Sequence, residues 1–543
     1  MKLVTVSEMR AIEKEADSSG LTYGQMMENA GVGLAIIIMD LIYEDDEQPG
    51  VLGLVGPGNN GGDTLVALAH LAAQDWHARA YLVNRPSEKD PLVERLRQAG
   101  GEITIAGQDE SEEMLTAFIG AASVVIDGVL GTGFKLPLKK DIAEVFQATN
   151  SAIADLDWPP YVVAVDCPSG VNCDTGEAVQ DAIPASVTVT MAAVKQGLVK
   201  FPAFDLVGDL RVVDIGLTDD VKAWAEIRNE VADEEMVGEI LPERPDDSHK
   251  GTFGTALIAA GSINYTGAAL LAGKAAYRVG TGLVTLAVPS PLHVVLAGHF
   301  PEATWLLLPH EMGVISSEAS DVLIKHLDRV TGLLLGPGFG TEETTRDFLE
   351  NLIEAKTLLK KGGPRIGFVH EDKKQKEEKN VTLPPLVIDA DGLKLIKQID
   401  NWEKLIPPSS ILTPHPGEMA ILTGLSRDEI QADRLGIASK FARQWGQVVI
   451  LKGAFTVIAS PEGYATVIPV ASSALARAGS GDVLAGLVVG LLAQGVEPYH
   501  AAVAGAWIHA QAGLFAAEKL GNPASVMAGD LIDSVSDVIM GMV

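Results

Sequence analysis

A recurring unit constrains this fold most: a short apolar run, a glycine-rich loop, and then a helix-like stretch. Val51–Val55 leads into the loop Gly56–Asp63 (Gly-Pro-Gly-Asn-Asn-Gly-Gly-Asp), and the stretch Leu65–Ala73 follows. Further apolar runs occupy Ala80–Val83, Ser123–Ile126 and Tyr161–Val165. Apolar strands that alternate with helices predict a parallel sheet covered on both faces. In such sheets the ligand site gathers at the carboxyl ends of the strands.

The same pattern restarts in the second half of the chain. A strand is expected at Thr255–Ala260, a helix at Gly267–Val279 and a strand at Leu283–Val288. Later strands are expected at Gly332–Leu335, Leu386–Ile388, Ser410–Leu412 and Val448–Leu451. The fold class is therefore α/β, with two three-layer α/β/α domains, the first of them Rossmann-like. We expect these domains over residues 1–217 and 236–543, with the acidic, weakly patterned stretch 218–235 as linker. The Lys- and Glu-rich run Lys360–Asn380 is expected to be a solvated inserted loop.

Composition excludes several classes of protein. The 41 Lys+Arg against 72 Asp+Glu give a net charge of −31, which argues against nucleic-acid or membrane partners. The hydrophobic share of 47% is too high for a disordered chain. Two cysteines, Cys167 and Cys173, are too few for a disulfide framework, and the N-terminus lacks the apolar core of a signal peptide. We expect a cytoplasmic homo-oligomer that acts on small molecules.

Four motifs of the first half belong together. Gly56-x-Gly58-x-x-Gly61 alone is a weak dinucleotide fingerprint, because the next strand ends in Asn84-Arg85 and not in the acidic residue such a loop needs. The full set is Met27–Gly31, Gly56–Asp63, Asp127–Gly133 and Asp166–Gly170. In order and separation these motifs resemble the NAD(P)H-hydrate epimerase domain over residues 1–217. Thr64 departs from that pattern, where a glycine is expected.

The resemblance implies roles for these residues. Asn60, Asp127 and Ser169 would bind a potassium ion, and all three supply the oxygen ligands that a hard cation prefers. Asp166 would contact the hydrate and act as the catalytic acid/base at its hydrated carbon, with Lys135 near the phosphates. The remaining hydrate-binding residues would be Asn59, Asn60, Gly61, Gly62, Asp63, Gly131, Thr132, Gly133, Phe134, Lys135, Leu136 and Pro137.

The second half carries a glycine-Asp loop, Ala478–Gly486, that opens a strongly apolar helix. Successive amides at a helix N-terminus form an anion site, which is the arrangement of ribokinase-like enzymes. Five more motifs accompany it: Ser248–Gly254, Gly336–Gly338, Asp389–Gly392, Thr413–Glu418 and Lys452–Thr456. Together they resemble the ADP/ATP-dependent NAD(P)H-hydrate dehydratase over residues 236–543, and they imply a ribokinase-like fold there.

That resemblance also assigns residues. Asp482 would be the catalytic base, which deprotonates the hydroxyl that is phosphorylated before elimination. Ala268, Gly338, His415 and Asp482 would contact the hydrate, and Lys452, Gly453, Ala454, Phe455, Thr456 and Gly481 the adenine nucleotide. Mg²⁺ would bridge the nucleotide phosphates.

Together the two halves predict an enzyme of metabolite repair. The first domain would interconvert the R and S epimers of hydrated NADH or NADPH, and the second would dehydrate the S form to NAD(P)H with consumption of ADP, ATP being the other candidate donor. Two alternatives remain. One is a small-molecule kinase of the ribokinase-like class with a nucleotide-binding regulatory domain, and the other is a non-catalytic nucleotide-binding scaffold.

Overall fold

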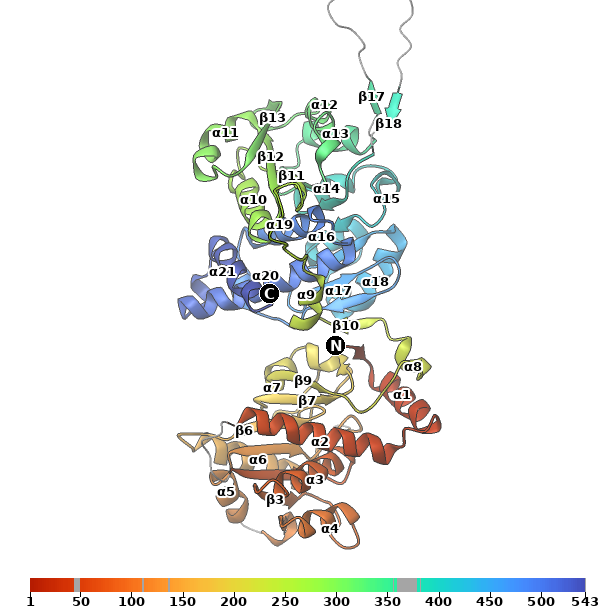
Figure 1. The fold of residues 1–543 in the computed structure, drawn as a ribbon, viewed down its shortest axis with the longest axis vertical. Coiled ribbons are helices and arrows are strands. Elements are labelled where there is room, and N and C mark those ends of the chain that lie inside the picture. Colours follow the sequence, from red (N-terminus) through yellow and green to blue (C-terminus); the bar gives the residue numbers. More distant parts are fainter. Residues whose placement is uncertain are drawn as a thin grey trace, which may run out of the picture. The chain divides into compact units, whose positions relative to one another are not determined.

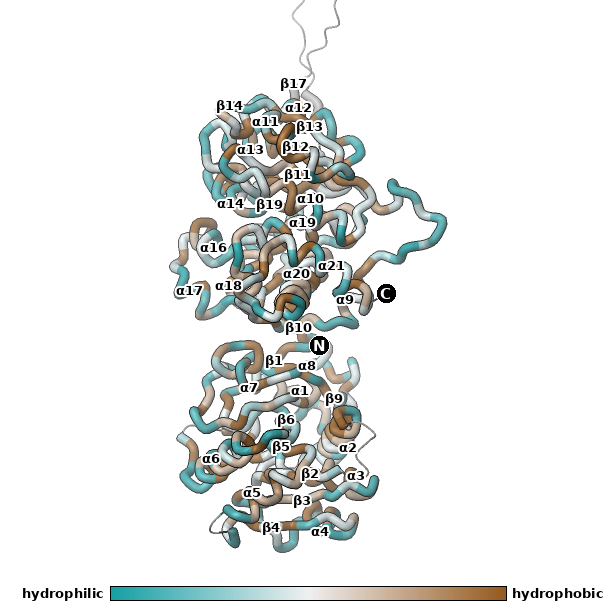
Figure 2. The backbone as a smooth tube through the Cα atoms, turned by 90° about the vertical axis from the view of Figure 1, so that its left-hand side faces the viewer, coloured by the Kyte–Doolittle hydropathy of each residue, from teal (hydrophilic) through white to brown (hydrophobic). Residues whose placement is uncertain are grey.

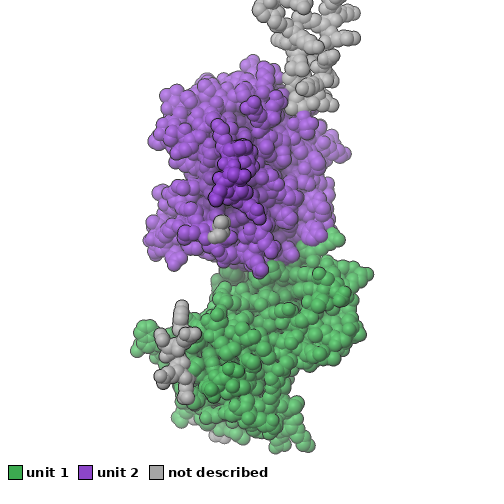
Figure 3. All heavy atoms as spheres, in the orientation of Figure 1, with its two compact units in different colours: residues 1–229 green, residues 230–543 purple. Residues whose placement is uncertain are grey.

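The computed structural model describes residues 1–42, 49–109, 112–134, 137–354, 356–358, 378–380 and 382–542 (Figure 1). The chain forms two compact units, Met1–Asn229 and Glu230–Val543 (Figure 3). Their boundary falls within the stretch predicted as linker. That stretch carries more structure than expected: α8 (Lys222–Ala225), β10 (Asn229–Val231) and the start of α9 (Glu234–Ile240).

The predicted insertion, Lys360–Asn380, lies almost wholly outside the described residues. Only its end is described, as β18 (Glu378–Asn380), which pairs in antiparallel fashion with β17 (Lys356–Leu358).

The first unit is built on a seven-stranded sheet in the order β4-β3-β2-β5-β6-β7-β9, and all its pairs are parallel. The strands are β2 (Gly50–Val55), β3 (His77–Leu82), β4 (Glu102–Ile105), β5 (Val124–Gly128), β6 (Tyr161–Val165), β7 (Val187–Met191) and β9 (Asp209–Val213). A short separate pair joins β1 (Leu3–Val4) to β8 (Val194–Lys195). The parallel sheet predicted from the apolar runs is confirmed.

Helices cover both faces of this sheet, as a three-layer fold requires. In β2, Val51 and Val55 belong to one apolar core, whereas Leu52 and Leu54 belong to the other, since successive strand residues point to opposite faces. The first core includes residues of α1 (Val6–Ser18), α2 (Tyr23–Leu41), α3 (Asn59–Ala72) and α4 (Pro91–Gln98). The second includes residues of α5 (Glu113–Gly120) and α6 (Lys140–Ala154).

The strand order fixes where a ligand can bind. From β2 the chain runs outward to β3 and β4, and then returns to β5 on the other side of β2. The segments that follow β2 and β5 therefore border the crevice at the topological switch point, which is the usual ligand site of such sheets.

One boundary at this crevice differs from the prediction. Helix α3 begins at Asn59, so Asn59–Asp63 form its first turns and are not a loop before Leu65. The tight turn from β2 into α3 requires glycine at position 61, because a Cβ at Gly61 would lie 2.0 Å from the carbonyl oxygen of Gly56.

The second unit has a ten-stranded sheet in the order β10-β23-β22-β21-β20-β19-β16-β11-β12-β13. Its strands after β10 are β11 (Thr255–Ala259), β12 (Leu283–Pro289), β13 (Thr304–Leu308), β16 (Gly332–Leu335), β19 (Leu386–Ile388), β20 (Ile411–Leu412), β21 (Val448–Leu451), β22 (Val457–Ala459) and β23 (Ala465–Val467). The strands from β13 to β21 are parallel, and β22 and β23 extend the sheet as antiparallel strands that the sequence pattern did not reveal. Brown, hydrophobic stretches mark β12 and β13 in Figure 2.

A large apolar core joins this sheet to α10 (Gly267–Arg278), α19 (Ser480–Ala493), α20 (Pro498–Leu520) and α21 (Ala528–Met540). Helices α10 and α19 approach closely, since a Cβ at Gly486 would lie 2.2 Å from the carbonyl oxygen of Ala272. Other helices of this unit are α11 (Ser290–Leu296), α12 (Ala319–Ile324), α13 (Glu343–Glu354), α14 (Asp391–Ile396), α15 (Trp402–Leu405), α16 (Pro416–Thr423), α17 (Arg427–Ala432) and α18 (Arg434–Trp445). Among the described helices of both units, none combines the length and apolar character that a membrane span requires.

Candidate active sites

A cavity of about 550 Å³ opens at the switch point of the first unit. Among the predicted hydrate-binding residues, those on its wall are Asn59, Asn60, Asp63, Gly131, Thr132, Gly133, Phe134 and Asp166. Gly61 and Gly62 are instead buried in the first turns of α3, where they pack against Gly56 and Met27. Pro137 is exposed, and Lys135 and Leu136 lie outside the described residues.

Asp166 follows β6 and enters this cavity wall with a left-handed φ of 64°. Its Oδ1 accepts hydrogen bonds from Thr190 Oγ1 (3.1 Å) and from the Met191 amide (3.0 Å), and it forms an ion pair with Lys195 Nζ. Lys195 is only 1% exposed, and its Nζ also donates to Thr190 Oγ1 and the Met191 carbonyl. Sequence reasoning missed this lysine; its one signal is that it follows the apolar run 192–194.

The three predicted potassium ligands come together beside this cavity. Asp127, at the end of β5, is fully buried, and its two oxygens accept from the Ser169 hydroxyl and from the Ser169 amide (2.7 Å). Asn60 donates its Nδ2 to the carbonyls of Val165 (2.5 Å) and Leu130 (3.3 Å). This side chain therefore bridges the ends of neighbouring strands, and its Oδ1 remains as a possible ligand.

The donor chemistry of this trio fits an alkali cation. One carboxylate, one hydroxyl and one amide offer oxygen atoms as ligands. The pKa of Asp127 is raised, because the effect of burial outweighs the hydrogen bonds from Ser169, which act to lower it. A cation would stabilise the charged form of this buried carboxylate. Thr64, where a glycine was expected, donates its hydroxyl to the Asn60 carbonyl (2.7 Å) and so supports the turn that holds Asn60. Throughout the described ranges, no group of three or more His, Cys, Asp or Glu side chains could hold a metal ion.

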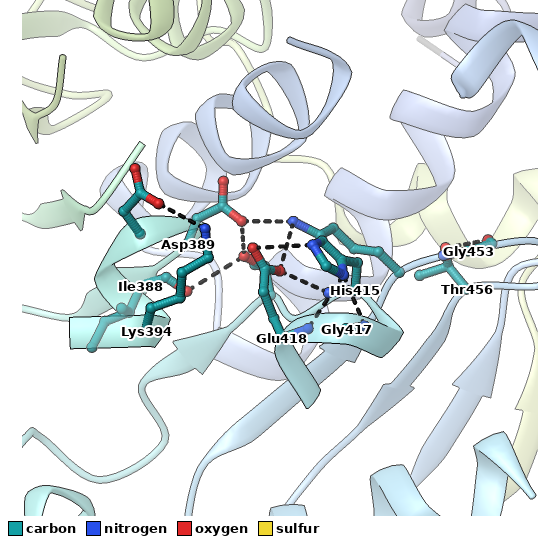
Figure 4. Close-up of polar contacts among 11 residues, drawn as sticks. Ile388, Asp389, Lys394, His415, Gly417, Glu418, Gly453 and Thr456 are labelled. Atoms are coloured by element: carbon teal, nitrogen blue, oxygen red, sulfur yellow. Dashed lines mark hydrogen bonds and ion pairs between the residues drawn. The ribbon is translucent and has the colours of Figure 1, made fainter. Parts of the chain in front are cut away.

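The second site centres on Lys452, which follows β21. Figure 4 shows Asp389, Glu418 and His415, which surround this centre. Its Nζ lies 2.7 Å from Asp389 Oδ1 and 3.8 Å from Glu418 Oε2, and both carboxylates are buried. Burial acts to lower the pKa of Lys452, but these two carboxylates outweigh it and raise the pKa above its usual value. Neither acid was predicted as a site residue, although both stand in motifs that the sequence singled out.

His415 caps α16 through its side chain. Its Nδ1 accepts from the amides of Gly417 (2.9 Å) and Glu418 (3.3 Å), so the ring is the neutral tautomer with its proton on Nε2. Burial and the nearby Lys452 lower the pKa of His415, which agrees with that form. Only Nε2 is left for a ligand, 3.4 Å from Glu418 Oε1.

Asp482 occupies the first turn of α19, after Gly479 with its left-handed φ of 88°. Burial, and then the charge of Asp389, raises the pKa of Asp482 to about 7. The start of α19 lies beside the other predicted nucleotide-binding segment, Lys452–Thr456, because a Cβ at Gly481 would lie 3.5 Å from Lys452 Nζ. The two glycine-rich motifs therefore form one site.

The other predicted contacts border the same region. Gly338, with φ 65°, packs on Ala268, since a Cβ at Gly338 would lie 2.9 Å from Ala268 Cβ. The amide of Gly340 in the same loop donates to Asp391 Oδ2 (3.0 Å), and the Asp391 charge contributes to the raised pKa of Asp482.

In the nucleotide segment, Gly453 and Thr456 close a turn, in which the Thr456 hydroxyl donates to the Gly453 carbonyl (2.9 Å). Ala454 is exposed in this turn, and Phe455 is buried.

Two α/β units, each with a buried carboxylate–lysine pair at the carboxyl ends of its strands, define a two-site α/β enzyme. Comparison with known proteins gives the family. The model of the YjeF-related protein N-terminus matches residues 23–197, and the NAD(P)H-hydrate dehydratase model matches 256–359 and 363–536.

Full-length relatives agree with both models. The bifunctional NAD(P)H-hydrate repair enzyme of Moorella thermoacetica is 35% identical over 100% of this chain and 97% of its own length. The enzyme of the same name from Escherichia coli is 31% identical over 98% of this chain and 93% of its own length. The chain belongs to the family of bifunctional NAD(P)H-hydrate repair enzymes.

Among solved structures, an ADP/ATP-dependent NAD(P)H-hydrate dehydratase from Bacillus subtilis, co-crystallised with ATP/Mg²⁺, is 28% identical. It covers 58% of this chain and 99% of its own, with a TM-score of 0.47.

Proposed function

We propose that this chain repairs hydrated NADH and NADPH: the first unit interconverts the R and S epimers, and the second dehydrates the S epimer with consumption of ADP. The observation that carries the proposal is the full-length similarity to bifunctional relatives, together with a separate carboxylate site in each unit. Product of the first site is substrate of the second, so the two activities repair both epimers.

In the first unit, Asp166 is the acid/base at the hydrated carbon. The cavity walls formed by α3 and by the segment after β5 would hold the nucleotide through backbone amides. Potassium at Asn60, Asp127 and Ser169 would neutralise the buried Asp127 and fix the strand ends around the substrate.

In the second unit, Asp482 is the base. Its pKa of about 7 leaves a substantial fraction ionised at neutral pH, where the ionised form can accept the proton of the substrate hydroxyl. The oxygen then receives the terminal phosphoryl group of ADP, and AMP is released. The carbon–oxygen bond breaks as phosphate departs, a better leaving group than hydroxide; the ring nitrogen forms a double bond to that carbon, and the adjacent carbon loses a proton to water to give NAD(P)H. Lys452 and the amides at the start of α19 would stabilise phosphoryl charge. Mg²⁺, held chiefly by phosphate and water oxygens, would neutralise the nucleotide.

The test mixes the protein with both purified hydrate epimers and follows recovery of NAD(P)H absorbance with ADP, with ATP and with neither. Recovery from both epimers with ADP supports the proposal. Accumulation of a phosphorylated product without elimination favours a kinase instead. Absence of turnover in all arms favours a nucleotide-binding scaffold. NADH hydrate and NADPH hydrate are compared in parallel.

We further propose a homo-oligomer in a reducing compartment such as the cytoplasm. Cys167 and Cys173 are both buried free thiols, as a reducing compartment allows. Apolar side chains remain exposed on α11 and on the edge strand β13, among them Val294 (84%), Val295 (61%) and Leu307 (45%). Apolar surface at a sheet edge suits self-association. A monomeric mass in light scattering at micromolar concentration would contradict the oligomer.

A further inference from the structure

Helix α1 forms one wall of the cavity in the first unit. Val6, Met9, Arg10 and Glu13 line the cavity, at the spacing of a single helical face. The strand before this helix pairs with the strand that carries Lys195, in the register Leu3↔Val194 and Val4↔Lys195. The pairing fixes the start of α1 beside the Asp166–Lys195 ion pair, although the two segments lie far apart in sequence.

Glu13 is the one acidic residue of α1 that has no structural partner. Glu8 completes the capping box with Thr5, Glu15 accepts from the amides of Lys222 and Ala223, and Asp17 accepts from the Tyr23 amide. In the described part of the chain, Glu13 makes no hydrogen bond and no ion pair. Its carboxyl is therefore not engaged in a direct contact of the fold, and Glu13 lines the cavity.

The groups around Glu13 favour its protonated form. Burial raises the pKa of Glu13 first and the charge of Asp166 raises it further, whereas Lys195 and Arg10 act in the opposite direction. Asp63, from α3, faces the same cavity and also interacts with Glu13. By contrast, Lys195, Thr190 and the Met191 amide all contact Oδ1 of Asp166, so this carboxyl group is held by three donors. Two carboxyl groups in different environments of one cavity are the usual arrangement of an acid with its base.

We propose that Glu13 is a second catalytic residue of the epimerisation, the proton donor that works with Asp166 as base; this inference rests on the proposed epimerase function. The Glu13 carboxyl gives its proton to the hydroxyl oxygen, the carbon–oxygen bond breaks, and water leaves as the ring nitrogen forms a double bond to that carbon. Water then adds to the other face, a new carbon–oxygen bond forms, and its proton passes to Asp166. The reverse reaction exchanges the two roles.

Exposure distinguishes Glu13 from Asp63 in this role. Each turnover moves one proton from the donor to Asp166, so the pair must exchange protons with water before the next turnover. Glu13 is half-buried, whereas Asp63 is only 6% exposed and lies in the first turns of α3. Glu13 is the carboxyl that can be reprotonated readily from solvent.

The test follows R-to-S conversion by chromatography without ADP, so that the second unit is idle. Glu13→Gln should lower kcat by about 100-fold or more with KM little changed, the effect of losing a general acid. Wild-type kcat should fall as pH rises through the Glu13 pKa, and this decline should be absent in Glu13→Gln. Glu13→Asp keeps the acid on a shorter chain and should recover part of the rate. The matched control is Glu94→Gln, an exposed acid on α4, which should leave the rate unchanged.

Each outcome decides the matter. Three results would overturn the role of Glu13. The first is full epimerase activity in Glu13→Gln, and the second is a change in its KM alone. The third is that the decline of kcat at high pH disappears in Asp63→Asn but persists in Glu13→Gln. Failure of the proposed function looks different, because the wild-type chain would then convert R to S no faster than the uncatalysed reaction. Repair of the S epimer with ADP should be unaffected in every variant, which shows that the second unit is intact, and an unchanged melting temperature of the first unit in calorimetry shows that the first unit remains folded.

Discussion

The buried pair between Asp166 and Lys195 permits a quantitative test of the first site. Their side chains are 11% and 1% exposed, so Lys195→Met leaves a buried carboxylate without its counter-ion. Breaking such a pair costs about 3–5 kcal/mol of the free energy of unfolding. For a unit of this size each kcal/mol lowers Tm by about 2–4 °C, so the first unit should melt about 6–20 °C lower. Differential scanning calorimetry of the full chain measures this shift.

Two further variants isolate the charge effect. Lys195→Met combined with Asp166→Asn removes both charges of this pair, so the double variant should be more stable than the sum of the two single changes predicts. The control is Lys222→Met, in an exposed pair with Glu226 whose side chains are 79% and 67% exposed, and its cost should be below about 1 kcal/mol. A cost for Lys195→Met as small as that of the control, or strict additivity in the double variant, would refute the reasoning.

Three other predictions concern the remaining parts of both sites. Asp482→Asn should abolish dehydration and leave epimerisation unchanged. In the wild type, kcat/KM of the dehydratase should rise with pH through about 7 as Asp482 loses its proton. A flat pH profile across that range would exclude Asp482 as the base. Removing potassium should slow the epimerase, and Asp127→Asn should make the rate insensitive to potassium; anomalous diffraction without a cation at Asp127 in potassium buffer would contradict this site. Gly56→Ala should destabilise the first unit by about 1–3 kcal/mol in urea unfolding, because its Cβ would lie 1.8 Å from the Val129 carbonyl. A Cβ at Gly58 meets nothing within 4 Å, so Gly58→Ala should cost less, only the loss of a favourable N-cap residue of α3.

Much of the second site could be predicted because its residues lie in contiguous motifs. Asp482 stands in a glycine-rich helix start whose local chemistry already indicates an anion site, Lys452 was assigned through the family resemblance, and the structure brings them together. Asp389 was visible only as a member of a motif. Its role as the carboxylate that pairs with Lys452 depends on a contact between residues 63 positions apart, which no local pattern encodes.

By itself, the sequence determined the fold class and the glycine-rich strand ends, because each depends on residues that are close along the chain. Only the tertiary structure decided where α3 begins, which strands meet at the switch point, and which carboxylates form ion pairs with buried lysines. Lys195 and Glu13 belong to the first site because parallel pairing of β1 with β8 brings α1 to Asp166. The charge state of a buried group depends on the neighbours that packing gives it in space, and this is why these two residues were not found from the sequence.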